Sequence, residues 1–258
     1  MSDLAAAFDR GAANYDLLVS LNPGYHRHLG SAATVLVRRA LARRTGARLL
    51  DLACGSGAST RALVDAVAAD RPPGGTLGRT SAGTPAEAPV AILGVDLSDG
   101  MLEQARRKTW PAGVEFRRGR VGDLDLDSLG EGAWDGVLAC YLFRNVPPDE
   151  RDAALREVAR LLAPGGWLVV QEYSVAGSPV ARLVWDLVSW AIIIPLGVVV
   201  DRNPGLYRYL WRSVRGFDST RAFAQRLAAA GFEDVRHRTV PGWQRGILHT
   251  FVAQRAAR

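Results

Sequence analysis

The sequence predicts a doubly wound α/β domain built on a sheet of about seven strands. Short, almost continuously apolar segments alternate along the chain with longer amphipathic ones. Strands of that kind are typical of parallel sheets that helices cover on both faces. The chain has 258 residues, 48% hydrophobic and 22% charged. This composition is ordinary for a globular protein with a sizeable core, so we expect one domain over residues 1–258.

The N-terminal part predicts two helices and the first strand. Residues 3–44 have helical character on both sides of an Asn-Pro-Gly turn at 22–24. An apolar run at 48–52 predicts a buried strand. A glycine turn follows it, and the pattern then predicts a helix over 59–69.

The middle of the chain predicts three more strands. Residues 70–89 are rich in Pro, Gly and Thr and have little to bury, which favours a mobile loop. Residues 90–96 predict the second strand, and Ser98 or Asp99 is the expected N-cap of the next helix. The third and fourth strands are expected at 114–119 and 134–143.

The C-terminal part completes the alternation. An amphipathic helix over 148–162 ends before Pro-Gly-Gly at 164–166, and a fifth strand is expected at 167–173. The segment 220–232 predicts a helix that ends at Gly231. The last two strands are expected at 233–240 and 247–255.

Charge and cysteine usage exclude several classes of protein. The formal net charge is +6, but no basic run or zinc-ligand spacing supports a nucleic-acid partner. The two cysteines, Cys54 and Cys140, lie far apart and predict neither a disulfide framework nor a metal site. The first residues lack the basic and apolar regions of a signal peptide. We expect a protein of the reducing cytoplasm.

A glycine-rich loop follows the first strand, where doubly wound sheets bind ligands. It reads Asp-Leu-Ala-Cys-Gly-Ser-Gly over 51–57. A dinucleotide site would have a third glycine at Thr60, and no phosphate-binding Gly-Lys-Ser/Thr is present. Asp96 closes the second strand, where a carboxylate can accept hydrogen bonds from ribose hydroxyls. Together these features indicate a nucleoside ligand without phosphates, such as S-adenosylmethionine. A plain strand–helix turn and a helix-capping Asp96 are the alternatives.

Three stretches resemble motifs of class I S-adenosylmethionine-dependent methyltransferases: DLACGSG, GVDLSDGML and RLLAPGGWLVVQE. The resemblance implies that Gly55 and Gly57 hold the amino-acid end of the cofactor and that Asp96 holds the ribose. It implies that Leu97 and Met101 flank the adenine. The rest of the predicted cofactor-binding set is Asp51, Ala53, Cys54, Thr60, Val121, Asp123 and Cys140.

One motif departs from that family. Its members usually have an acidic residue after the third strand that contacts the adenine amine. The matching stretch here reads GRVGDLDL, which places Arg120 at that position. Either Asp123 or a backbone group near Val121 then takes over the contact.

Five further stretches resemble the ubiquinone/menaquinone-biosynthesis C-methyltransferases: FDRGAANYD, HRHL, FRNV, LYRYLWRSV and GILHTF. The resemblance implies a prenylated quinol as substrate, with demethylmenaquinol as the main expectation, and an N-terminal helical lid over 1–45. The segment after Tyr15 is shorter than usual, which leaves the exact acceptor open. The alternatives are another phenolic or lipidic acceptor, methylated on carbon or oxygen, and a lipid-binding protein that has lost transfer.

The resemblance implies that Arg144 and Asn145 are the catalytic pair. A guanidinium is not a base at neutral pH, but it can stabilise the phenolate that develops on the quinol or position a water molecule. An arginine paired with Asp149 or Glu172 is the alternative. Weaker substrate-side candidates are Tyr15, His26 and Tyr207, and His26 is also consistent with a helix surface.

The segment 183–200 contains 18 residues and a single charge, which is borderline for a membrane span. Asp186 and Pro195 interrupt it, so we expect it to be part of a helical substrate cover over 178–216. That cover would hold a prenyl tail and rest on a bilayer, and an ordinary buried helix is the alternative. The oligomeric state stays open, a homodimer included.

Overall fold

A computed structural model describes residues 24–42, 46–70, 90–201 and 204–257. Three predictions lie outside these residues: the first N-terminal helix, the role of Tyr15 and the loop at 70–89.

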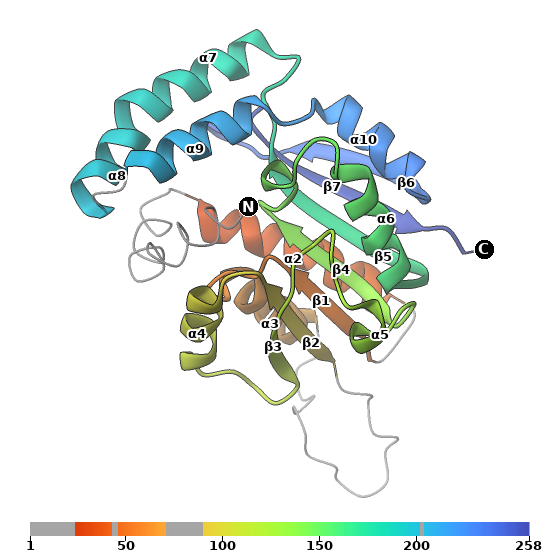
Figure 1. Ribbon diagram of the computed structural model, residues 1–258. Coiled ribbons are helices and arrows are strands. Elements are labelled where there is room, and N and C mark those ends of the chain that lie inside the picture. The colour runs from red at the N-terminus through yellow and green to blue at the C-terminus, as the bar shows by residue number, and fades with distance from the viewer. Residues whose placement is uncertain (1–23, 43–45, 71–89, 202–203, 258) are drawn as a thin grey trace, which may run out of the picture.

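The core of the fold is a seven-stranded sheet with the order β3-β2-β1-β4-β5-β7-β6 (Figure 1). Its first five strands are parallel, and β7 runs antiparallel to both β5 and β6. The bounds are β1 Arg48–Leu52, β2 Ala91–Asp96, β3 Val114–Arg118, β4 Trp134–Cys140, β5 Leu162–Tyr173, β6 Phe232–Thr239 and β7 Leu248–Arg255. This confirms the predicted fold class, to which the structure adds one reversed strand.

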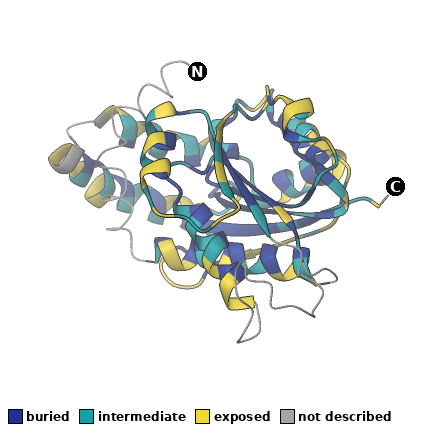
Figure 2. Cartoon of the chain, turned by 90° about the horizontal axis from the view of Figure 1, so that it is seen from below, coloured by how far each residue is buried: buried dark blue, intermediate teal, exposed yellow. Residues whose placement is uncertain are grey.

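Helices cover both faces of the sheet. Their bounds are α2 Tyr25–Leu41, α3 Ala58–Asp70, α4 Asp99–Arg107, α5 Leu126–Leu129, α6 Arg151–Leu161 and α10 Thr220–Ala229. One apolar core lies between the sheet and α2 with α3, and a second lies between the sheet and α5, α6 and α10. The strands therefore form a buried layer between the two sets of helices (Figure 2).

The fourth strand is shorter than predicted. It ends at Cys140, and a 3-10 helix, η1 (Phe143–Asn145), replaces the expected continuation to 143. Tyr141 adopts a φ of 59°, which ends the extended conformation. Residues 144 and 145 therefore turn away from the strand direction at its carboxyl end.

The helical arm after β5 consists of α7 (Pro179–Val188), η2 (Ser189–Ile193), α8 (Ile194–Asp201) and α9 (Pro204–Arg215), which lie together in Figure 1. The segment η2 is a π-helical turn in which the Ile194 N–H donates to the Ser189 carbonyl. Pro195 follows directly, and it lacks the N–H of a regular helix and would crowd the carbonyl four residues back. The wider turn removes that conflict and keeps the helix continuous.

Candidate active site

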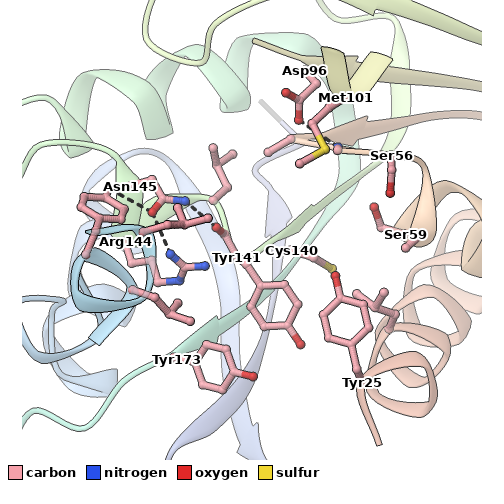
Figure 3. A pocket seen from close by; sticks show the side chains of 18 of the residues that line it. Tyr25, Ser56, Ser59, Asp96, Met101, Cys140, Tyr141, Arg144, Asn145 and Tyr173 are labelled. Carbon is pink, nitrogen blue, oxygen red and sulfur yellow. Dashed lines mark hydrogen bonds between the residues drawn. The ribbon is translucent and has the colours of Figure 1, made fainter. Parts of the chain in front are cut away.

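A cavity of about 760 Å³ opens at the carboxyl ends of β1, β2, β4 and β5, beneath the helical arm. Figure 3 shows Asp96, Met101 and Ser56 on one side of it, Arg144 and Asn145 on the other, and Tyr141 and Cys140 between them. The predicted residues that line it are Ala53, Cys54, Gly55, Asp96, Leu97, Met101, Val121, Cys140, Arg144, Asn145 and Tyr207.

The glycine loop after β1 has two glycines in the left-handed region. Gly55 (φ 55°) lines the cavity, and a Cβ there would meet nothing within 4 Å. Gly57 (φ 90°) lies behind the loop, where a Cβ would come within 2.8 Å of the Trp110 ring. The loop thus presents bare backbone to a ligand at Gly55, while Gly57 serves close packing.

Asp51 and Thr60 hold this loop from below. Asp51 is fully buried, and its Oδ2 accepts hydrogen bonds from Ser59 Oγ at 2.8 Å and Thr60 Oγ1 at 2.6 Å. Burial raises the pKa of Asp51 to about 7, against the two hydroxyl hydrogen bonds that lower it. Neither Asp51 nor Thr60 lines the cavity, so any effect of theirs on a ligand passes through the loop.

Asp96 lies at the cavity wall and connects the two neighbouring strand ends. Its Oδ2 accepts the Gly55 N–H and its Oδ1 the Ser98 N–H, both at 2.8 Å. Ser98 is the N-cap of α4, since its side chain accepts the Met101 N–H. The carboxylate is therefore held in one orientation beside the glycine loop.

Beyond Asp96 the wall is formed by residues after β3. Val121 and Arg120 both line the cavity, and Arg120 Nη2 donates to Glu150 Oε2 at 2.7 Å. Asp123 is exposed and does not line the cavity, and its backbone N–H donates to the Arg120 carbonyl. Of the two alternatives for the adenine contact, the backbone near Val121 is the one at the cavity.

Arg144 lines the cavity and is also part of a buried ion pair. Its Nε lies 3.2 Å from Glu172 Oε1, and the two side chains are 9% and 0% exposed. Glu172 Oε2 accepts the Arg144 N–H. Burial raises the pKa of Glu172, and Arg144 opposes that shift. The sequence gives an ion pair with Glu172 as an alternative to a position at the ligand site. The structure has both, since Arg144 pairs with Glu172 and also lines the cavity.

Asn145 connects Arg144 to the helical arm. Its Oδ1 accepts Arg144 Nη1 at 2.7 Å and the Tyr209 hydroxyl at 3.2 Å, and its Nδ2 donates to the Tyr141 carbonyl at 2.9 Å. Arg144 Nη1 also donates to Ser213 Oγ at 3.3 Å. Tyr209 and Ser213 both belong to α9, so the predicted catalytic pair contacts the arm directly.

A row of aromatic side chains on the cavity wall is not predicted from the sequence. Tyr25, Tyr141 and Tyr173 stack with ring centroids 5.6 and 5.1 Å apart, and Trp185 follows Tyr173 at 5.4 Å. All four line the cavity. His26, one of the predicted substrate-side residues, is exposed, does not line the cavity, and contacts the edge of the Tyr25 ring.

Both cysteines lie at the cavity and are buried. Burial raises the pKa of each thiol well above its usual value, so both are uncharged at neutral pH. Among the described residues, no group of three His, Cys, Asp or Glu side chains is arranged to hold a metal ion.

Residues of α7, η2 and α8 form the apolar end of the cavity: Val184, Trp185, Val188, Ile192, Ile193 and Leu196, of which Ile192 is also exposed to solvent. On the outward side of the same arm, large apolar side chains face solvent: Val180, Leu183, Leu187, Trp190, Val198 and Val199. Within the described part of the chain, one helix, Pro179–Val199, has the length and apolar character of a membrane-spanning helix.

The sheet and the glycine-loop site define a class I methyltransferase. The fold matches that of a solved S-adenosylmethionine-dependent methyltransferase from Thermotoga maritima, with a TM-score of 0.58 at 20% identity, over 99% of this chain and all of that one. The chain belongs to the ubiE/COQ5 methyltransferase family, whose model matches residues 3–253.

Two relatives illustrate the family. A demethylmenaquinone methyltransferase of Clavibacter sepedonicus is 31% identical over 92% of this chain and 85% of its own length. A ubiquinone/menaquinone biosynthesis C-methyltransferase UbiE of Methylobacterium nodulans is 35% identical over 90% of this chain and 83% of its own.

Proposed function

We propose that this methyltransferase uses S-adenosylmethionine to methylate a ring carbon of a reduced, prenylated quinone, with demethylmenaquinol as the acceptor. One observation carries the proposal. A single cavity joins the glycine loop and Asp96 to the Arg144–Asn145 pair and continues beneath an apolar helical arm. A nucleoside, a phenol and a hydrocarbon chain each match one part of that cavity.

The residues at the strand ends fit the cofactor. Gly55 and Ala53 would hold its amino-acid end, Asp96 its ribose, and Leu97, Met101 and Val121 its adenine. The carboxylate beside bare loop backbone offers acceptors to hydroxyls, and the side chains of Leu97, Met101 and Val121 next to it are apolar. When bound, the cofactor supplies a methyl group on a positively charged sulfur.

Arg144 and Asn145 would act on the acceptor. A phenol ring carbon becomes nucleophilic as the adjacent hydroxyl loses its proton, so a donor that stabilises the phenolate accelerates transfer. The Arg144 guanidinium can stabilise that oxygen or a water molecule that accepts the proton. Asn145 orients the arginine through its Oδ1.

We further propose that the helical arm touches the cytoplasmic face of a bilayer. Its outward apolar residues would enter the interface, and the exposed Arg208 and Arg212 of α9 would face anionic headgroups. Because its inward face lines the cavity, the arm would cover the substrate tail rather than span the membrane.

Binding to anionic vesicles should fall for the double variant Leu187→Ser/Trp190→Ser. Unchanged vesicle binding of this variant would contradict the contact.

The direct test is transfer from labelled S-adenosylmethionine to chemically reduced demethylmenaquinone, with mass spectrometry of the product. One added methyl on a ring carbon supports the proposal. A methyl on oxygen, or transfer only to another phenolic lipid, moves the function to the alternative acceptor. Cofactor binding without any transfer would leave the binding protein as the explanation.

A further inference from the structure

The charge of Arg144 is largely compensated before any substrate arrives. Glu172 lies 3.2 Å from its Nε, and Nη1 donates to Asn145 and Ser213. The ion pair is close to neutral as a unit. It therefore stabilises an adjacent anion by less electrostatic energy than a lone guanidinium would. A second hydrogen-bond donor at this end of the cavity would therefore add to the stabilisation of a bound anion.

Tyr209 supplies such a donor. It lines the cavity from α9, and its hydroxyl lies 3.2 Å from Asn145 Oδ1. Arg144 Nη1 lies 2.7 Å from the same oxygen. Both donors thus reach the same oxygen atom, that of Asn145, so the Tyr209 hydroxyl and the Arg144 guanidinium lie next to each other at this end of the cavity.

The surroundings of Tyr209 keep its hydroxyl protonated. Burial raises its pKa and Glu172 adds to the increase, while Arg144 and Arg151 act in the opposite direction. At neutral pH the tyrosine is a hydrogen-bond donor and not a base.

We propose that Tyr209 is a catalytic residue whose hydroxyl turns from Asn145 Oδ1 to the phenolic oxygen of the acceptor and, together with Arg144, donates to that oxygen as it becomes negative. The inference rests on the proposed function. In the overall reaction the acceptor ring carbon forms a bond to the methyl group. The bond between that methyl group and sulfur breaks, with its electron pair staying on the neutral thioether. The proton displaced from the ring carbon leaves to water, and the phenolic hydroxyl is regained.

The first experiment compares Tyr209→Phe with wild type on quinols of graded phenol acidity, prepared by ring halogenation. Removal of one oxyanion donor lowers kcat by about 100-fold. We expect that loss with the unsubstituted quinol and a smaller loss with more acidic ones, which need less stabilisation. The KM and the affinity for S-adenosylhomocysteine should change little. A loss of equal size for every acceptor would overturn the role.

The matched control is Trp211→Phe. Trp211 lies on the same helix and donates to Asp186 Oδ1 at 2.7 Å, but it does not line the cavity. This variant tests whether loosening the packing of α9 is sufficient to cause the same acidity-dependent loss of kcat. If Trp211→Phe reproduced the dependence on acceptor acidity, α9 closure and not the Tyr209 hydroxyl would explain the effect.

A second experiment needs no cofactor. A halogenated 1-naphthol, whose ionised form absorbs at longer wavelength, is bound to the protein and titrated. Arg144, Glu172 and Arg151 are the charged groups around Tyr209, and they are the same in both proteins. The pKa of the bound naphthol should be higher in Tyr209→Phe than in wild type, and equal values would refute the inference. If wild type methylates no quinol, the proposed function fails, and this titration still decides the role of Tyr209.

Discussion

Replacing Arg144 by methionine should affect stability as well as catalysis, because Glu172 would lose its partner. Glu172 is fully buried and lies 3.2 Å from the guanidinium. Removing one member of a buried ion pair costs about 3–5 kcal/mol. The carboxyl group can limit that cost by taking up a proton. From its ordinary pKa of 4.5, this uptake costs about 3.4 kcal/mol near neutral pH. We expect Arg144→Met to lose about 3 kcal/mol of unfolding free energy there.

The pH dependence of that loss identifies its cause. Burial raises the folded-state pKa of Glu172 above 4.5 even while Arg144 opposes the shift, so removing Arg144 should raise this pKa further. The folded protein then binds more protons than the unfolded chain. Its stability is complete below the unfolded pKa and falls as the pH rises, by about 1.4 kcal/mol per pH unit. The deficit relative to wild type should therefore shrink on acidification.

Urea unfolding followed by tryptophan fluorescence, over a series of pH values, measures this. The double variant Arg144→Met/Glu172→Gln is the control, because it removes the buried charge. One amide oxygen cannot replace both carboxylate oxygens that accept the Arg144 and Tyr173 N–H groups, so a loss of about 1–3 kcal/mol should remain. Both variants should be inactive in methyl transfer. A deficit that does not depend on pH, or a double variant no more stable than the single one, would refute the reasoning.

Three further predictions concern the cofactor end. Asp96→Asn should weaken binding of S-adenosylhomocysteine by about 10- to 100-fold in calorimetry, since charge-assisted hydrogen bonds contribute about 1.5–3 kcal/mol; unchanged affinity would remove Asp96 from the site. Gly57→Ala should lower the unfolding free energy by about 2 kcal/mol, because φ is 90° and Trp110 lies 2.8 Å from the added Cβ; Trp110→Ala should relieve part of that loss. The folded pKa of Asp51 is raised from 3.8 to about 7, so its contribution to stability is present at acid pH and is lost as the pH rises through that window. Asp51→Asn should flatten the corresponding slope in urea unfolding, and an unchanged slope would contradict the assignment.

The fold and the cofactor end could be predicted from the sequence because their signals are local. Most strands of the parallel part contain a short apolar run, as in β1, β2 and β4, and the glycine loop directly follows β1. The reversal of β7 could not be predicted, since the pattern of a buried strand does not carry its direction. The end of β4 could not be predicted either, because it depends on a left-handed tyrosine at position 141, a conformation rare for bulky residues.

The acceptor end could be predicted only in part, because it is assembled across long separations in the chain. Arg144 was found through a motif, and Glu172 through the need of a buried arginine for a partner. Tyr209 lies 64 residues from Asn145 and reaches it only when the arm folds over the strand ends. The tyrosine row likewise joins distant parts of the chain, namely α2, the end of β4 and the end of β5. One signal for Tyr209 is available in the sequence. Tyr209 lies two residues after Tyr207 in the stretch LYRYLWRSV, where the resemblance to the family points to Tyr207 alone.

The Arg144–Glu172 ion pair explains why Arg144, at the strand ends, depends on a donor from the helical arm. An unpaired buried arginine would be a strong binder of anions, but desolvating it would be costly. Pairing the arginine with Glu172 lowers this desolvation cost. The same pairing weakens the electrostatic attraction between the arginine and a phenolate. A donor that carries no charge can add to the stabilisation of the phenolate without adding a desolvated ion, and Tyr209, on a helix that lines the cavity, meets that requirement. The hydrogen bonds that Tyr209 donates to Asn145 and that Ser213 accepts from Arg144 also hold α9 over the cavity. In the proposed mechanism, the helix that covers the cavity is therefore also the one that carries the second donor.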